Sequence, residues 1–259
     1  MYLTWLDSNS WLIELAGKRF LLDPWLVGEL TFGNVGWLFK GTRSHDRAIP
    51  ENLDLILLSQ GIEDHAHPET LKKLDRSIPV IASPSAAKVA QAIGFSSITP
   101  LKHGESFTVA QSIQIQATPG SSLGPGVQEN GYLITELPTG VTLYYEPHGN
   151  HPSALPTPID VVITPLIDLA LPLVGSIIKG TPSAIKLAQQ VKPQIILPTA
   201  AGGDIQFEGI LISLLRAIGN TDDFRSKLAQ ANLDTQVIEP KPGERIEITV
   251  QASAIANSL

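Results

Sequence analysis

Asp64 and His65 are the first residues along the chain whose types and position could do metal chemistry. They lie in LLSQGIEDHAHPET (57–70), an apolar run that crosses a short acidic turn and enters a helix at Pro68. A strand that leads through such a turn into a helix is typical of a metal-binding loop, and carboxylates and imidazoles bind zinc and manganese. The alternative is structural, because an Asp and a His just before a helix can satisfy its unpaired backbone groups. We expect His67, next to the proline, to be exposed to solvent.

A second group of titratable residues follows an apolar strand later in the chain. Glu146, His148 and His151 lie close together in EPHGNHP (146–152). A loop rich in Pro and Gly with two histidines is often only a polar loop. However, strand ends in layered sheet proteins are where sites are built, since a rigid scaffold presents loops there. His148 is therefore the residue of this group to test first.

The two groups belong to the two halves of an internal repeat. WLIELAGKRFLLDP (11–24) and YLITELPTGVTLYYEP (132–147) both predict a strand, a tight turn with glycine, a second strand, and an acid followed by proline. Each is followed by a strand, at 52–60 or 158–166, whose continuous hydrophobicity predicts burial on both faces. Alternation predicts a last strand at 244–250. Helices are predicted to begin at Pro68, to begin at Pro84 and end at Gly94, to follow Thr181, and to span 207–218 and 221–231.

The repeat also predicts how the layers pack. Two similar halves, each with a mixed sheet and helices, cannot each cover both faces of a sheet alone. Packing the sheets on one another with the helices outside solves this, so we predict a four-layer αββα sandwich built from two similar halves. We expect a single domain over residues 1–250 and a frayed tail at 251–259.

Composition narrows the possible partners and cofactors. The chain has 259 residues, of which 43% are hydrophobic and 17% charged, so it can bury a large core. Its net charge of −7 repels phosphate backbones, and we expect no nucleic-acid partner. The sequence has no cysteine, so His, Asp and Glu would have to hold any metal, and a cytoplasmic location is favoured. The start, MYLTWLDSNS, does not resemble a secretory signal.

One strongly apolar segment needs a membrane test. VVITPLIDLALPLVGSII (161–178) is close to the minimum length for spanning a bilayer, but Asp168 and two prolines argue against a transmembrane helix. Its first half is already explained as a buried strand. The remainder, 166–178, could be simple core, pack over the site, form a homo-oligomer contact or touch a membrane surface.

The glycine-rich stretch TPGSSLGPGVQEN (118–130) predicts a turn. It matches no phosphate-loop spacing and lacks the lysine of such loops. A glycine with positive φ is the simpler explanation for its composition.

Five motifs follow one another along nearly the whole chain. They are LTWLDSNSWLIELAGKRFLLDPWL at the start, the loop at 60–65, ATPG (117–120) followed by ENGYLI (129–134), LYYEPHG (143–149) and IILPT (195–199). In this order they resemble the metallo-β-lactamase superfamily, in particular its lactonase-like bacterial branch. The resemblance implies the αββα fold predicted from the repeat.

The resemblance also implies two metal ions, at positions that this sequence matches poorly. The family holds its metals with a His-x-His-x-Asp-His loop, a third His after a Pro-Gly turn, a bridging Asp and a final His. The first three histidines hold one metal, and their positions fall here at Gln60, at Ile62 and at the pair Ser121 and Ser122. Neutral oxygens bind zinc poorly and an isoleucine offers no lone pair. The resemblance therefore implies that this metal position is lost.

The other implied metal position is partly retained. Asp64 and His65 match the Asp and His of the loop, and alignment of LYYEPHG places His148 at the bridging Asp, while the final His falls at Thr199. Two histidines and one carboxylate with an open position are a recognised arrangement for catalytic zinc. We therefore expect either no cofactor or one zinc or manganese ion on Asp64, His65 and His148.

Three functions follow as hypotheses, and we favour the first. The first is a non-catalytic or weakly active member of the family that binds a small ligand. The second is a single-metal hydrolase in which Asp64 and His148 act in catalysis and Glu146 or Glu63 is the base; the resemblance implies lactones, esters or phosphoesters as substrates. The third is a membrane-associated or oligomeric protein that works through residues 166–178.

Overall fold

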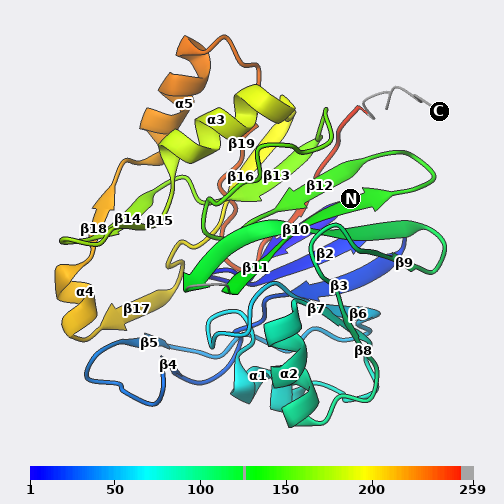
Figure 1. The fold of residues 1–259 in the computed structure, drawn as a ribbon, viewed down its shortest axis with the longest axis vertical. Coiled ribbons are helices and arrows are strands. Elements are labelled where there is room, and N and C mark those ends of the chain that lie inside the picture. The colour runs from blue at the N-terminus through cyan, green and yellow to red at the C-terminus, as the bar shows by residue number, and fades with distance from the viewer. Residues whose placement is uncertain (125–126, 252–259) are drawn as a thin grey trace. The chain divides into compact units, whose positions relative to one another are not determined.

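The computed structural model describes residues 1–124 and 127–251, and the chain divides into two compact units (Figure 1). Unit 1 comprises Met1–Lys102, Ala200–Leu215 and Pro240–Ile248. Unit 2 comprises His103–Thr199, Arg216–Glu239 and the chain from Thr249 onward. The single domain over 1–250 stays a prediction, and the predicted tail lies outside the described residues from residue 252 onward.

The main sheet of unit 1 joins an antiparallel part to a parallel part. Its strand order is β20-β1-β2-β3-β6-β7-β8, and the pairs from β3 to β8 are parallel. Ala16 and Gly17 form the tight turn between β2 and β3, and both have positive φ, as such hairpin turns require. The strands are β1 (Tyr2–Trp5), β2 (Trp11–Leu15), β3 (Lys18–Leu22), β6 (Leu55–Leu58), β7 (Val80–Ala82), β8 (Ile98–Pro100) and β20 (Arg245–Glu247).

Helices α1 (Pro68–Lys73) and α2 (Pro84–Ile93) pack against the parallel strands of this sheet. Every residue of β6 is buried, as its continuous apolar sequence predicts. The Ser83 side chain caps α2 by accepting from the Ala86 amide, and Gly94 ends the helix in the left-handed conformation. A smaller sheet, in the order β17-β5-β4, completes unit 1 together with a short helix. These elements are β4 (Leu30–Thr31), β5 (Lys40–Arg43), β17 (Ile205–Glu208) and α4 (Ile210–Leu214).

Unit 2 repeats the architecture of unit 1. Its main sheet has the order β19-β16-β13-β12-β11-β10-β9, in which β9 to β12 pair antiparallel and β12 to β19 in parallel. A small sheet has the order β15-β14-β18. The strands are β9 (Ser106–Val109), β10 (Ile113–Gly124), β11 (Val127–Glu136), β12 (Thr142–Tyr145), β13 (Val161–Thr164), β14 (Asp168–Leu171), β15 (Gly175–Ile178), β16 (Ile195–Pro198), β18 (Arg216–Ile218) and β19 (Gln236–Val237).

Helices α3 (Thr181–Val191) and α5 (Thr221–Gln230) pack on the parallel half of this second sheet and lie side by side (Figure 1). The helix predicted to follow Thr181 forms α3, in which Ala184, Leu187, Ala188 and Val191 are all buried. Helix α5 begins at the predicted residue, Thr221, and the Asn220 side chain caps it by accepting from the Asp223 amide.

The internal repeat is confirmed. In unit 1 the hairpin β2–β3 leads to the buried parallel strand β6, and in unit 2 the hairpin β11–β12 leads to the buried parallel strand β13. The acid that ends each hairpin, Asp23 or Glu146, is fully buried. The repeat therefore places two buried carboxylates at equivalent ends of the two sheets.

The prediction of a helix over 207–218 is wrong. The segment instead forms β17, the short helix α4 and the strand β18. Gly209 interrupts it with φ of 114°, and a side chain there would lie 2.6 Å from the Leu38 carbonyl oxygen. Because β17 pairs with β5 and β18 pairs with β14, hydrogen bonds to distant strands replace those of a helix.

The apolar segment 161–178 forms strand β13 followed by the β14–β15 hairpin. Among the helices of the described residues, none is long and apolar enough to cross a membrane. Leu173, Val174 and Ile177 of the hairpin are exposed, so the simple-core alternative for 166–178 does not hold for these side chains.

The described part of 118–130 forms paired strands, and the predicted turn stays a prediction at residues 125 and 126. Thr118 and Pro119 of β10 pair with Gly131 and Asn130 of β11, and residues 125 and 126 lie outside the described residues. Gly120 does not have positive φ; a side chain there would lie 2.9 Å from the Asn130 backbone. Close approach of the two strands, rather than a turn conformation, requires this glycine.

Candidate metal centre and the loops that position it

The loop that carries Asp64 and His65 is held at both ends in unit 1. It leaves the buried strand β6 at Leu58 and enters α1 at Pro68. The prediction of an exposed His67 is wrong, since this residue is buried and caps α1 by accepting from the Thr70 amide through Nδ1. Its Nε2 lies 3.2 Å from the Glu29 carbonyl oxygen. His67 is thus a structural anchor, and burial lowers its pKa.

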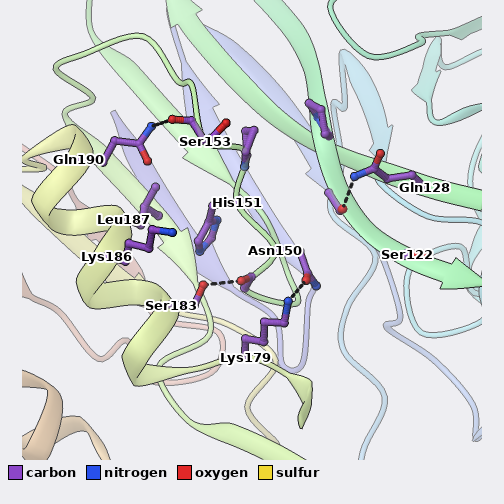
Figure 2. Close-up of a pocket in the computed structure, with 14 residues that line it drawn as sticks. Ser122, Gln128, Asn150, His151, Ser153, Lys179, Ser183, Lys186, Leu187 and Gln190 are labelled. Atoms are coloured by element: carbon purple, nitrogen blue, oxygen red, sulfur yellow. Dashed lines mark hydrogen bonds between the residues drawn. The ribbon is translucent and has the colours of Figure 1, made fainter. Parts of the chain in front are cut away.

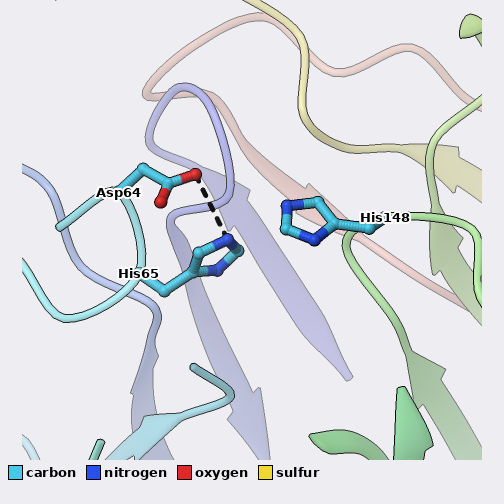
Figure 3. Close-up of side chains that lie close together, drawn as sticks. All are labelled: Asp64, His65 and His148. Atoms are coloured by element: carbon cyan, nitrogen blue, oxygen red, sulfur yellow. Dashed lines mark ion pairs between the residues drawn. The ribbon is translucent and has the colours of Figure 1, made fainter. Parts of the chain in front are cut away.

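His65 lies between two carboxylates. Its Nδ1 is 2.7 Å from an Asp23 oxygen and its Nε2 is 3.2 Å from an Asp64 oxygen, and the ring is fully buried. Figure 3 shows the Asp64–His65 ion pair. The structure therefore brings together the two neighbouring residues that the sequence predicted as ligands, and it fixes the imidazole from behind.

The same two carboxylates control the charge of His65. Burial alone would lower the pKa of this imidazole, but Asp64 and Asp23 outweigh burial and raise the pKa to about 10. The protein thus stabilises positive charge at this point. An imidazolium ring provides that charge when no metal is bound, and a metal ion on Nε2 would displace its proton.

Asp23 is the residue of this centre that sequence analysis missed. Its carboxylate accepts from both the amide and the hydroxyl of Ser59, at the start of the loop, as well as contacting His65. Its backbone has φ of 42°, a left-handed conformation that Asp tolerates better than most residues. The signal in the sequence was the acid followed by proline at the end of each repeat. A carboxylate behind a metal-binding histidine orients the ring and raises its basicity.

Gln60, Ile62 and Glu63 complete the loop. Gln60 is fully buried and Ile62 half-buried, and the Ile62 carbonyl accepts from the amides of His65 and Ala66, which makes the turn. Glu63 accepts from the Gly33 amide at 3.2 Å. The role of Ile62 that the structure supports is in the backbone of the turn.

In unit 2, Glu146 organises the loop that carries His148. Its Oε2 accepts from the backbone amides of His148, at 3.2 Å, and Asn150, at 2.6 Å. Glu146 is fully buried, and it stands at the end of β12 as Asp23 stands at the end of β3. These contacts are those of a positioning carboxylate, and the catalytic role of Glu146 stays a prediction.

His148 is half-buried on the loop after β12 (Figure 3). Its Nδ1 lies 3.0 Å from the Ser121 hydroxyl, so the structure brings together two of the predicted site residues of unit 2. If Nδ1 donates to this hydroxyl, Nε2 carries the lone pair that a metal would need. Ser121 is buried and Ser122 is exposed, whereas Thr199 is buried with its amide donating to the Thr164 carbonyl. The site-lining role of Thr199 stays a prediction.

The second histidine of this loop, His151, is enclosed by hydroxyl groups. Its Nδ1 and Nε2 each lie 3.3 Å from an oxygen, of Tyr144 and of Thr164 respectively. Burial, and then the positive charge of Lys179, lower the pKa of His151 to about 3. The ring is therefore neutral in the folded protein at physiological pH.

Comparison with known families defines the class of protein. A family model described as the Beta-lactamase superfamily domain matches residues 2–200, and the chain belongs to this family. The predicted resemblance to the metallo-β-lactamase superfamily, and with it the αββα fold class, is confirmed.

Individual relatives are distant in sequence. A UPF0173 metal-dependent hydrolase of Methanopyrus kandleri is 22% identical over 255 residues, which cover 95% of this chain and all of that protein. An isothiocyanate hydrolase from Delia radicum gut bacteria has a TM-score of 0.68 at 16% identity, over 96% of this chain and 99% of that one. A possible metal-dependent hydrolase from Veillonella parvula has a TM-score of 0.67 at 15% identity, with the same coverage. The structural likenesses show the fold.

Proposed function

We propose that this protein is a metal-dependent hydrolase that uses a single zinc or manganese ion. Membership of the family and similarity to a protein named as a metal-dependent hydrolase support this proposal. The observation that carries it is the placement of His65, whose Nδ1 contacts Asp23 while its Nε2 and the Asp64 carboxylate face one another at 3.2 Å.

The spacing of these two donor atoms suits a shared ion. Ligand atoms about 2.0–2.1 Å from a tetrahedral zinc ion lie roughly 3.3 Å from each other. The Nε2 of His65 and Oδ2 of Asp64 are separated by 3.2 Å, and a carboxylate already orients the ring. The spacing of these two ligand atoms, both from one loop of unit 1, therefore fits a zinc ion. His148, which the sequence alignment adds, is our proposed third ligand.

We propose that the second metal position of the family is lost in this chain. Its ligands would come from Gln60, Ile62 and Ser121, of which only Gln60 and Ser121 have a side-chain oxygen. Neutral oxygens are poor ligands for zinc, and a site built on two of them would not retain it.

A bound ion would polarise a carbonyl or phosphoryl oxygen and lower the pKa of water, which is the chemistry that hydrolysis needs. In unit 1 Asp23 holds the His65 ring, and in unit 2 Glu146 holds the backbone of the His148 loop. Glu63 or Glu146 is proposed as the base. The substrate class remains that of the sequence hypothesis: lactones, esters or phosphoesters. The cytoplasmic location also stays a prediction.

Metal analysis of the full-length protein tests the proposal. We expect about one equivalent of zinc or manganese per chain by plasma mass spectrometry. His65→Gln and His148→Ala should each lower metal content and hydrolysis of a lactone, ester and phosphoester panel together. His45→Ala is the matched control, because His45 is exposed and lies outside the proposed ligand set. It should retain metal and activity.

Three results would overturn the proposal. A protein that stays metal-free after zinc is added would fit the alternative of a non-catalytic member that binds a small ligand. Two equivalents of metal would contradict the loss of the second position. Full metal content in His148→Ala would remove that residue from the ligand set.

The exposed β14–β15 hairpin favours a second, independent role in association. Leu173 and Val174 stand at its tip and are largely exposed, and Ile177 follows on β15. We propose that residues 166–178 contact a second copy of the chain. Leu173→Asp should then shift the protein to a smaller species in sedimentation velocity. An unchanged monomer excludes this role, and flotation of the wild type, but not the variant, with lipid vesicles would assign the hairpin to a membrane surface.

A further inference from the structure

A pocket of about 400 Å³ lies in unit 2 (Figure 2). Its walls come from the β10–β11 hairpin, from the loop at 149–153 and from α3 together with Lys179, just before this helix. Ser122, which the sequence predicted to line the site, lines this pocket. Asp64, His65 and His148 do not. The volume is within the range that holds small organic ligands.

The pocket is positively charged in an acidic protein. Its lining includes Lys179 and Lys186, and none of the described residues that line it carries a carboxylate. The Lys179 ammonium donates to the Asn150 side-chain oxygen at 2.7 Å, and this neutral partner does not compensate the lysine charge. In Figure 2 the Lys186 side chain is directed from α3 toward the part of the pocket where His151 lies. Two cations therefore face a space without anions, in a chain of net charge −7.

The helix α3 contributes one polar face and its positive end. Lys179, Ser183, Lys186 and Gln190 follow one another at intervals of four and three residues, so the three that lie on α3 share one side of the helix. Ser183 is in the first turn, where the helix dipole favours negative charge. The opposite side of α3 is the apolar face that packs on the sheet.

Hydrogen bonds fix the walls before any ligand arrives. The Ser183 hydroxyl donates to the Gly149 carbonyl at 2.5 Å, and the Gln190 amide donates to the Ser153 carbonyl at 3.1 Å. Gly149 has φ of 72°, and a side chain there would lie 1.8 Å from the Lys179 carbonyl oxygen. Only glycine permits this approach, which brings the loop against α3. A rigid site loses less entropy when it binds a ligand.

His151 forms a neutral part of the lining. Both of its ring nitrogens are within hydrogen-bonding distance of hydroxyl groups, of Tyr144 and of Thr164. The positive charge at the pocket therefore comes from the two lysines and the helix end.

We propose that this pocket binds the anionic group, phosphate or carboxylate, of a small molecule, with Lys179 and Lys186 as its cationic contacts. Lysine recognises such groups as a point charge with several donors, while Asn150 holds the Lys179 ammonium and Ser183 holds the loop at Gly149. Its cationic residues and walls belong to unit 2, and its lining does not include Asp64, His65 or His148.

Amide chemical-shift titrations of the full-length protein test the proposal. The probes are inorganic phosphate and succinate, each added at low ionic strength in the presence of a chelator. We expect saturable shifts confined to residues 149–153 and 179–190. Lys179→Gln and Lys186→Gln should each raise the Kd of the more tightly bound probe about tenfold. Lys227→Gln is the control, since Lys227 is an exposed lysine on α5 outside the pocket. It should bind as the wild type does.

The two probes identify the chemistry of the ligand. Tighter binding of phosphate assigns a phosphorylated ligand, and tighter binding of succinate assigns a carboxylate. The absence of saturable shifts with both probes would refute the proposal, and so would equal binding by the wild type and the two pocket variants. The chelator keeps the result separate from the metal hypothesis. Phosphate binding in His148→Ala at the wild-type Kd would further support a distinct site.

Discussion

Replacement of His151 by glutamine should change how the stability of this protein depends on pH. The imidazole is half-buried in unit 2, packs edge-on against Tyr144 with ring centroids 5.7 Å apart, and contacts the hydroxyls of Tyr144 and Thr164. Burial, together with the charge of Lys179, lowers its pKa from 6.5 to about 3. In the unfolded chain the same ring recovers an ordinary pKa near 6.5.

The sign and size of the effect follow from these two values. Between pH 6.5 and pH 3 the unfolded chain binds a proton at His151 that the folded chain does not, so acid favours unfolding. The contribution is fully present above pH 6.5 and is lost progressively as the pH falls toward 3. The pKa shift of His151 from 6.5 to about 3 lowers the free energy of unfolding by about 2 kcal/mol between pH 7 and pH 5.

Urea denaturation at pH 7 and at pH 5 measures the effect. The wild type should lose about 2 kcal/mol more of its unfolding free energy than His151→Gln over this interval, because every other group titrates alike in the two proteins. The comparison does not require the variant to be as stable as the wild type at pH 7. Equal losses in the wild type and His151→Gln would refute the assignment of a buried, neutral ring.

Three further predictions follow from other contacts. Asp23→Asn should weaken zinc affinity about 10- to 100-fold, measured by competition with a chromophoric chelator, and an unchanged affinity would remove Asp23 from the support of the metal centre. Asp7→Ala removes a fully buried carboxylate from two arginines and should destabilise the protein by about 3–5 kcal/mol in urea; Asp222→Ala, which breaks an exposed pair, should leave the midpoint nearly unchanged. Gly61→Ala would place a methyl group 2.8 Å from the Ser85 hydroxyl oxygen and should lower the free energy of unfolding, measured by thermal melting, by about 1–3 kcal/mol. Gly36→Ala, where the nearest atom would be 3.7 Å from the new methyl group, should leave stability nearly unchanged.

Local chemistry in the sequence predicted most of the regular elements. Pro84 and Gly94 bound α2 because proline suits a first helical position and glycine suits a left-handed end. The continuous apolar runs at 55–58 and 161–164 are buried strands, and the repeat of hairpin and buried strand is present in both units. Each of these features depends on residues that are neighbours in the chain.

Predictions failed where distant residues decide the conformation. The segment 207–218 has helical composition, but pairing of β17 with β5 and of β18 with β14 provides hydrogen bonds that the composition does not encode. His67 was expected in solvent because it precedes a helix, yet the Glu29 carbonyl and the Thr70 amide enclose it. For 207–218 the partners are strands far along the chain, whereas His67 combines a contact with Glu29, 38 residues away, and a local cap on the Thr70 amide.

The candidate site divides in the same way. The sequence by itself determined that Asp64 and His65 stand together on a strand-to-helix loop, because two adjacent residues share one turn. It also determined that neither Gln60 nor Ile62 offers an imidazole nitrogen to a metal. Only the tertiary structure decided that Asp23 holds the His65 ring and that Glu146 directs its carboxylate at backbone amides. It alone showed that two lysines on and beside α3 face a pocket without carboxylates. These features depend on the direction of side chains across packed strands and helices, which sequence spacing does not specify.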